Sequence, residues 1–288
     1  MEKVTVVLNV FKRSGNFATQ LEALRSQTVP PFEILVWENG EETVIDLCSR
    51  EVTVARANRN LGVWSRFAFA LNATGDYILI LDDDTVPGRK WIENCLSAIK
   101  SHPGLLGTRG LRFSSKYSYA GYSEVGLYSP NRAVELVDIV GHAWFFKRET
   151  LGAFWAEYSN RFPGSLSGED IHFSFAVQKV LGLNTFVPPH PPDDTEMWGS
   201  NPDLAKTFGT DSVAISMGKD SLEKFEKAFS HYISKGFRLM IESNSAHGVK
   251  KRVPPFWGIL MSRFPGITSR LSGTQLGQFL RRLFLKEL

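Results

Sequence analysis

The amino-acid sequence predicts an α/β protein with a mostly parallel sheet flanked by helices. Short apolar runs, rich in β-branched residues, alternate with longer segments in which apolar residues recur at helical spacing. Such an order of strands and helices is typical of parallel strands joined by right-handed crossovers. With 43% hydrophobic and 22% charged residues, the 288-residue chain has the composition of a folded protein rather than a disordered one.

The amino-terminal third carries the clearest alternation. Strands are expected at residues 4–10, 32–37, 52–55 and 77–81, and helices at 16–27, at 61–73 and from Trp91 onward. Phe17, Leu21 and Leu24 share one face of the first helix, which predicts that this face packs on the sheet.

The remainder of the chain has a weaker pattern. Residues 107–135 are rich in Gly, Ser, Tyr and Arg and show no clear period. Residues 139–146 are interpreted as a strand broken by Gly141 and His142, residues 170–181 as a helix and residues 184–187 as a short strand. We therefore expect this half to be less regular.

Three consecutive carboxylates, Asp82, Asp83 and Asp84, directly follow the apolar strand at residues 77–81. They should lie at the carboxyl edge of the sheet, where open α/β sheets bind ligands. Adjacent negative charges repel, and Mg²⁺ or Mn²⁺ prefers such oxygen ligands, commonly sharing them with a substrate's phosphates. We expect Asp84 to bind the metal directly and Asp82 to reach a ribose hydroxyl or a metal-bound water. The alternative is a solvated turn or a helix cap before Trp91.

Several blocks of the chain resemble one enzyme family. The segments VTVVLNVFKR, ILVWENG, RANRNLGVWSRFAFALNATGDYILILDDD, VGHAWFFKRETL and GEDIHFSFAVQKVLG are similar to motifs of GT-A-fold, nucleotide-sugar-dependent glycosyltransferases of the inverting family 2. The similarity covers residues 4–209, and a weaker one links the same blocks to the retaining, exostosin-like transferases. The resemblance implies transfer of a sugar from a nucleoside diphosphate, with a UDP-sugar as the first choice.

The resemblance also implies a set of donor-binding residues at the carboxyl ends of the first strands. They are Asn9, Phe11, Arg13, Asn39, Asn58, Asn60, Arg66, Asp82 and Asp83. Arginine pairs bidentately with phosphate, which suits Arg13 and Arg66, although a solvated helix face would explain Arg66 as well.

Glu169 and Asp170 open the helix predicted near residue 170, after a Gly- and Ser-rich loop. The positive end of a helix dipole favours ionised carboxylates there, so an ordinary acidic helix start is one reading. By resemblance to the family's acidic pair, Asp170 is the general base that accepts the acceptor's proton, and Glu169 holds an acceptor hydroxyl.

Histidines and tryptophans supply further candidates. His190 lies in a Pro-rich loop where relatives often present a histidine metal ligand, and a surface residue is the alternative. His142 and His172 are interpreted as packing or acceptor-site groups. Trp144 and Trp198 could stack on an acceptor sugar or belong to the core.

We expect a GT-A domain at residues 1–243, followed by a basic extension at 244–288. Within the GT-A domain, the nucleotide-sugar half is expected at 1–105 and the acceptor half at 106–243.

From Lys250 onward the chain has eight Lys and Arg residues but only one acid, Glu287. Five apolar residues there share one helical face, which predicts contact with an anionic membrane, and packing on the core or on a partner subunit is the alternative: Leu276, Phe279, Leu280, Leu283 and Phe284. With no signal peptide expected before Val4 and no membrane-spanning run, we expect a cytoplasmic protein, peripheral on the inner face of the membrane.

The expected function is metal-dependent, inverting glycosyl transfer to a glycan or lipid-linked acceptor, with retaining transfer as the alternative. Two other classes are considered. A sugar nucleotidyltransferase would need a Gly-rich phosphate loop, which residues 11–16 do not form, and a non-catalytic sugar-binding module would not need both acidic clusters. No hydrolase motif is found, and we expect no nucleic-acid partner.

Overall fold

The computed structural model describes residues 2–40, 52–163, 168–209 and 220–245. The chain divides into two compact units, Met1–Ser243 and Asn244–Leu288. The basic tail and its expected apolar face lie outside the described residues, so the fold below is that of the first unit. In the described part of the chain, no helix combines the length and the apolar character needed to cross a bilayer.

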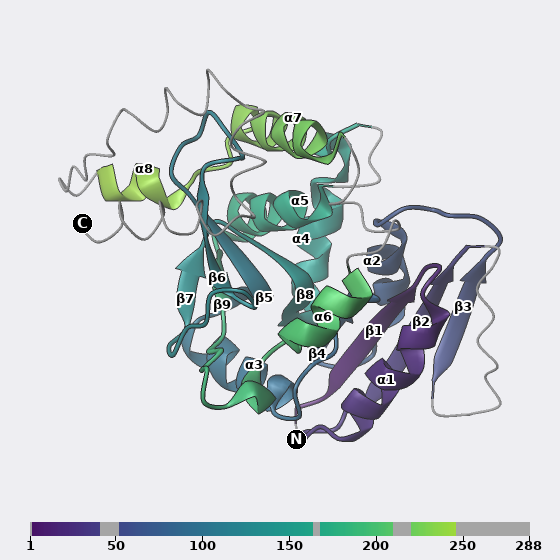
Figure 1. Ribbon diagram of the computed structural model, residues 1–288. Helices are drawn as coiled ribbons and strands as arrows, with labels where there is room; N and C mark the ends of the chain where they lie inside the picture. Colours follow the sequence, from purple (N-terminus) through teal and green to yellow (C-terminus); the bar gives the residue numbers. More distant parts are fainter. Residues whose placement is uncertain (1, 41–51, 164–167, 210–219, 246–288) are drawn as a thin grey trace. The chain divides into compact units, whose positions relative to one another are not determined.

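A nine-stranded sheet with the order β3-β2-β1-β4-β8-β5-β9-β7 forms the centre of the unit, and β6 pairs with β5 (Figure 1). The pairs β1–β2, β1–β4 and β2–β3 are parallel, whereas β8 runs antiparallel to both β4 and β5. The strands are β1 Val4–Val10, β2 Glu33–Asn39, β3 Thr53–Ala57, β4 Tyr77–Leu81, β5 Gly104–Phe113, β6 Tyr122–Gly126, β7 Glu135–Val137, β8 Ile139–Lys147 and β9 Asn184–Val187. The predicted α/β class is confirmed.

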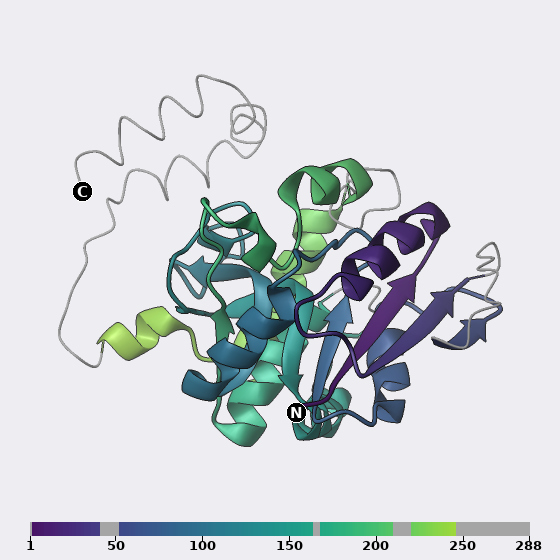
Figure 2. The same ribbon diagram turned by 90° about the horizontal axis from the view of Figure 1, so that it is seen from below.

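Helices cover both faces of this sheet, as the two views show (Figures 1 and 2). They are α1 Ser14–Arg25, α2 Ser65–Phe69, α3 Trp91–Ser101, α4 Leu151–Ala156, α5 Glu169–Ala176, α6 Pro202–Gly209 and α7 Ser221–Ser234. A further helix, α8 Met240–Ser245, spans the boundary between the two units. Because side chains alternate along a strand, Val6 of β1 packs in the core with α1 and α3, while Val7 packs in the core with α2, α4 and α5. Burial on both faces explains why these strands are continuous apolar runs.

A third core lies under α5 and α7. It joins Leu111 of β5 and Ile139 of β8 to Phe175 of α5 and to Phe229 and Tyr232 of α7. This core fastens the start of α5, which carries the acidic pair, to the antiparallel part of the sheet.

The element predictions differ from the structure in both halves of the chain. β4 has the predicted bounds, but the helix expected at 61–73 is the short α2 followed by a 3₁₀ turn at Ala70–Asn72. The helix expected at 170–181 changes after α5 into a π-helical turn at Val177–Leu181. Strands β5, β6 and β7 occupy the region that was assigned no period.

Candidate active site

The three aspartates leave β4 at the edge where β1 and β2 also end, and side chains of α1 fix the turn that they form. Gln20 is buried and donates from Nε2 to the carbonyl oxygens of Asp82, at 2.7 Å, and Thr85, at 2.8 Å. Asn16 donates from Nδ2 to the carbonyl oxygen of Asp83 at 3.0 Å. The contacts from α1 therefore hold the turn through its backbone and do not use the carboxylates. Asn16 and Gln20 were not expected from the sequence.

A bulge in β8 brings His142 to the same place. Gly107 of β5 pairs with Trp144 and Arg109 pairs with Gly141, so two residues of β8 lie opposite the single residue Thr108. His142 has a left-handed φ of 65°, a conformation that non-glycine residues rarely adopt outside such local irregularities. Its carbonyl oxygen accepts hydrogen bonds from the Asp82 amide, at 3.2 Å, and the Thr85 hydroxyl, at 2.8 Å. The bulge thereby turns the imidazole toward the aspartates.

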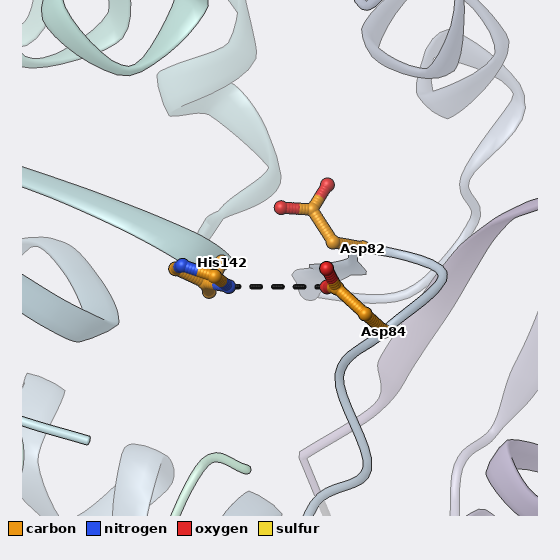
Figure 3. A group of neighbouring side chains, drawn as sticks. All are labelled: Asp82, Asp84 and His142. Carbon is orange, nitrogen blue, oxygen red and sulfur yellow. Dashed lines mark ion pairs between the residues drawn. The ribbon is translucent and has the colours of Figure 1, made fainter. Parts of the chain in front are cut away.

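Asp82, Asp84 and His142 gather around one space (Figure 3). Each offers a ligand atom, and these atoms lie within 4.8 Å of one another. Asp84 Oδ1 and His142 Nδ1 are buried, have no hydrogen-bond partner among the described residues, and face each other at 3.8 Å. That distance is too long for a hydrogen bond, and two buried polar atoms without hydrogen-bond partners leave a position that a cation could fill. Two carboxylates and one imidazole suit Mn²⁺, so a metal held here would have a nitrogen ligand beside its carboxylate ligands.

His190, the histidine that sequence analysis expected as a metal ligand, lies elsewhere and is fully buried. Its Nδ1 contacts the Pro188 carbonyl oxygen at 2.8 Å, and its Nε2 contacts Thr108 Oγ1 at 2.8 Å and accepts from the Gly199 amide. Both ring nitrogens are thus committed to the protein, and burial lowers the pKa of His190 to about 4. The imidazole beside the aspartates is that of His142. His190 instead supports Thr108, opposite the bulge.

Two buried arginines hold the carboxylates. Arg13 Nη1 lies 2.6 Å from Asp83 Oδ1 and 3.3 Å from Asp84 Oδ2. Arg66 Nη1 lies 2.8 Å from Asp82 Oδ1, and its Nη2 lies 2.9 Å from Glu169 Oε1. Arg66 therefore links the end of β4 to the start of α5.

The arginines do not fully offset the cost of burying the acids. Burial raises the pKa of Asp82 to about 6, against the opposing charge of Arg66, and raises the pKa of Asp83 to about 7, against Arg13. Burial also works against ionisation of Asp84, yet His142 and Arg13 hold its pKa below the ordinary value. Excess negative charge of this kind is what a divalent cation would neutralise.

The acidic pair lies across from the aspartates, at the first turn of α5. Gly168, with φ of 95°, precedes the helix, and Glu169 is buried against Arg66. The Asp170 carboxylate packs against Gly141, where any Cβ would meet Asp170 Oδ2 at 2.9 Å. Burial, and then the charge of Glu169, raise the pKa of Asp170 well above its ordinary value. A carboxyl group with this environment is suited to accept a proton.

The expected donor residues are only partly brought together. Asn39 donates from Nδ2 to Asn60 Oδ1 at 3.2 Å and accepts from the Leu61 amide at 2.8 Å, so the two asparagines shape one loop. The Phe11 ring lies against Gly40 at the end of β2. Asn9 is buried near the end of β1, whereas Asn58 is exposed beyond β3.

The aromatic and histidine candidates for the acceptor belong to the core. Trp144 is fully buried beneath the Arg66 guanidinium, and Trp198 is buried and donates from Nε1 to the Pro191 carbonyl oxygen. His172 contacts the Phe154 carbonyl oxygen and the Tyr232 hydroxyl, and burial lowers its pKa to about 4. These three residues pack within the protein, so stacking on an acceptor by either tryptophan is ruled out by its burial.

Comparison with known proteins agrees with this geometry. The sequence model of Glycosyl transferase family 2 matches residues 5–155, from β1 to α4, including the aspartates and His142. A curated relative, the glucosyl-dolichyl phosphate glucuronosyltransferase of Haloferax volcanii, is 26% identical over 117 residues. The matched part covers 38% of this chain and only 37% of that relative. The family match spans more than half of the chain, and with the sheet architecture described above it shows that the protein belongs to glycosyl transferase family 2, a family of glycosyltransferase enzymes with the GT-A fold.

Proposed function

We propose that the protein transfers a sugar from a nucleoside-diphosphate donor to a hydroxyl of a glycan or lipid-linked acceptor. The preferred donor is a UDP-sugar, and the reaction uses a divalent metal and inverts the configuration at the anomeric carbon. One observation carries this proposal. Two unsatisfied buried atoms, Asp84 Oδ1 and His142 Nδ1, lie at the sheet edge next to Gly141, against which the Asp170 carboxylate packs.

Asp82, Asp84 and His142 are the residues that would hold Mn²⁺ or Mg²⁺. When bound, such an ion neutralises the negative charge that grows on the leaving diphosphate. Arg13 lies beside Asp83 and Asp84, so its guanidinium can add positive charge at the same phosphates.

The ends of β1, β2 and β3 supply the remaining donor contacts. We assign Asn9, Phe11, Asn39, Asn58 and Asn60 to the base and ribose. The Phe11 ring against Gly40 offers a flat apolar surface, and the loop ordered by Asn39 and Asn60 offers amides. Arg66 is placed to hold Asp82 and Glu169 in register rather than to meet the donor directly, because both of its terminal nitrogens bind carboxylates.

Asp170 acts as general base. As the acceptor oxygen attacks the anomeric carbon, its proton passes to the Asp170 carboxylate, the new C–O bond forms, and the electron pair of the breaking bond leaves with the diphosphate. Glu169, fixed by Arg66, orients the acceptor hydroxyl. Retaining transfer, catalysed by the same acidic residues, is the alternative. The anomeric configuration of the product, determined by NMR, distinguishes the two outcomes.

A lipid-linked acceptor and a membrane location extend the proposal. The curated relative is named for action on a glucosyl-dolichyl phosphate, which supports an acceptor of this kind. The eight cations from Lys250 onward would favour an anionic membrane surface on the inner face. Deleting residues 250–288 should release the protein from vesicles of anionic lipid, and unchanged partition would contradict this part of the proposal.

The direct test is calorimetry with UDP and GDP, each with and without Mn²⁺. We expect Mn²⁺-assisted binding of one nucleotide, which a chelator abolishes. Nucleotide binding that neither Mn²⁺ nor a chelator alters would contradict the metal-dependent mechanism.

A further inference from the structure

We propose that Arg109, Glu124 and Tyr128 form a subsite for an uncharged pyranose ring of the acceptor, beside Asp170. The inference rests on the proposed function and deepens it, because it names the chemistry of the acceptor that this side of the site recognises.

The register of the sheet places Arg109 on the side of the proposed base. Arg109 pairs with Gly141 across β5 and β8, so both residues direct their Cβ positions to the same face. The Cβ position of Gly141 points at the Asp170 carboxylate. The Arg109 side chain leaves the sheet about one strand spacing (~5 Å) from Gly141. It therefore lies beside the Asp170 carboxylate, which is the proposed acceptor of the proton.

Glu124 of β6 completes a polar pair on this face. It lies opposite Leu111, diagonal to Arg109, and its Oε1 accepts from Arg109 Nε at 3.1 Å and also from Nη2. Both side chains remain 27% exposed. Arg109 Nη1 and Glu124 Oε2 make no hydrogen bond to the described protein, so one donor and one acceptor group stay available for sugar hydroxyls.

Tyr128 stands on a rigid turn next to this pair. Gly126, with φ of +94°, and Ser129 exchange backbone hydrogen bonds of 2.8 Å, and the Leu127 amide donates to the Thr108 carbonyl oxygen at 3.0 Å. Leu127 is buried, while Tyr128 is 49% exposed and its ring centroid lies 5.9 Å from the Arg109 guanidinium carbon. The anchored turn presents a tyrosine ring to solvent from a backbone that is held in place.

These three groups match the surface of a neutral sugar. An amphipathic ring can cover the C–H face of a pyranose, and a few fixed polar groups orient its hydroxyls. Glu124 already balances the charge of Arg109, which favours an uncharged ring over a carboxylated or phosphorylated one. The buried Trp144 and Trp198 cannot supply such a stacking face.

The test is saturation-transfer NMR on the full chain with methyl β-glucoside, methyl β-galactoside, methyl β-N-acetylglucosaminide and methyl β-glucuronide as probes. Tyr128→Ala and Glu124→Gln are compared with Tyr117→Ala, because Tyr117 is an 81% exposed tyrosine of the same segment. At least one neutral glycoside should bind the wild type and Tyr117→Ala, and bind Tyr128→Ala and Glu124→Gln about tenfold more weakly.

Three results would overturn the subsite: no neutral glycoside binding to the wild type, equal binding by Tyr128→Ala, or tighter binding of the glucuronide than of the neutral probes. UDP with Mn²⁺ is measured on the same samples and should bind all four proteins alike. Glycoside binding without nucleotide binding would count against the proposed function while leaving the subsite in place.

Discussion

On the proposed donor side of the sheet edge, the Asp82–Thr85 turn is held by the α1 side chains Asn16 and Gln20, whereas on the proposed acceptor side the polar groups depend on a bulge in β8. Gln20 and Asn16 fix the donor turn through three backbone carbonyls. On the acceptor side, Gly141 and His142 share a single irregular stretch, and Asp170 packs directly on it. A change confined to Asp170 should therefore leave the donor side intact, whereas a substitution in the bulge should disturb both the proposed base and the proposed metal site, because the His142 carbonyl oxygen also bonds the turn.

Asp170→Asn should have the largest effect and separates the two sides most sharply. Loss of the proposed general base should lower kcat by about a hundred- to ten-thousandfold, because an amide cannot accept the proton. Binding of UDP with Mn²⁺, a donor-side property, should be unchanged by calorimetry. Near-normal turnover would remove Asp170 from the mechanism.

Gly141→Ala should come next, with a loss of about a hundredfold in kcat. The added methyl group would meet Asp170 Oδ2 at 2.9 Å, so the carboxylate must move, and a displacement of this kind is costly for catalysis. Gly152→Ala in α4 is the matched control, because nothing lies within 4 Å of its Cβ position. If both variants turned over alike, the close approach of Asp170 to the bulge would have no catalytic importance.

His142→Ala tests whether the bulge also serves the donor side. Removing a proposed direct ligand should weaken Mn²⁺-assisted UDP binding by at least about tenfold, since even outer partners of a metal contribute that much. His102→Ala, which changes a histidine just after α3, should leave the Mn²⁺ titration unaltered. If His142→Ala kept the wild-type affinity for Mn²⁺, His142 would not be a ligand and only the carboxylates would bind the metal.

A prediction on stability rather than activity concerns pH and the burial of His190 opposite the bulge. Burial lowers the pKa of His190 from 6.5 to about 4 in the folded protein. Between these pH values the His190 side chain is protonated in the unfolded chain but not in the folded chain. The free energy of unfolding therefore has its full value above pH 6.5 and falls as the pH drops toward 4. The contribution is roughly 3 kcal/mol at most. Urea unfolding across this range should show a shallower pH dependence for His190→Gln, and identical slopes would contradict it.

The sequence predicted the parallel strand that carries the aspartates more accurately than the antiparallel strands. The run at 77–81 predicted β4 with its bounds, and hence the edge position of the aspartates, because a strand buried on both faces is a continuous apolar segment. Glu169 and Asp170 were expected at a helix start and are found there. Their catalytic roles remain predictions.

The antiparallel strands escaped prediction for a physical reason. β5 contains Gly104, Gly107 and Gly110, and a Cβ at any of them would collide with a neighbouring strand. These glycines allow the close packing of the strands. They also interrupt the pattern of apolar residues by which a strand is recognised in a sequence. Strands β6 and β7 are short and partly exposed, so they carry even less pattern.

By itself, the sequence determined the α/β class, the positions of α1 and α3 and the edge at which Asp82, Asp83 and Asp84 emerge, because periodic burial of apolar residues is a local property of the chain. Only the tertiary structure decided that His142 rather than His190 lies beside the aspartates, and that Arg66 links Asp82 to Glu169. Those choices depend on strand register and on one bulge, which bring together residues far apart in the chain, and no local pattern specifies such a pairing.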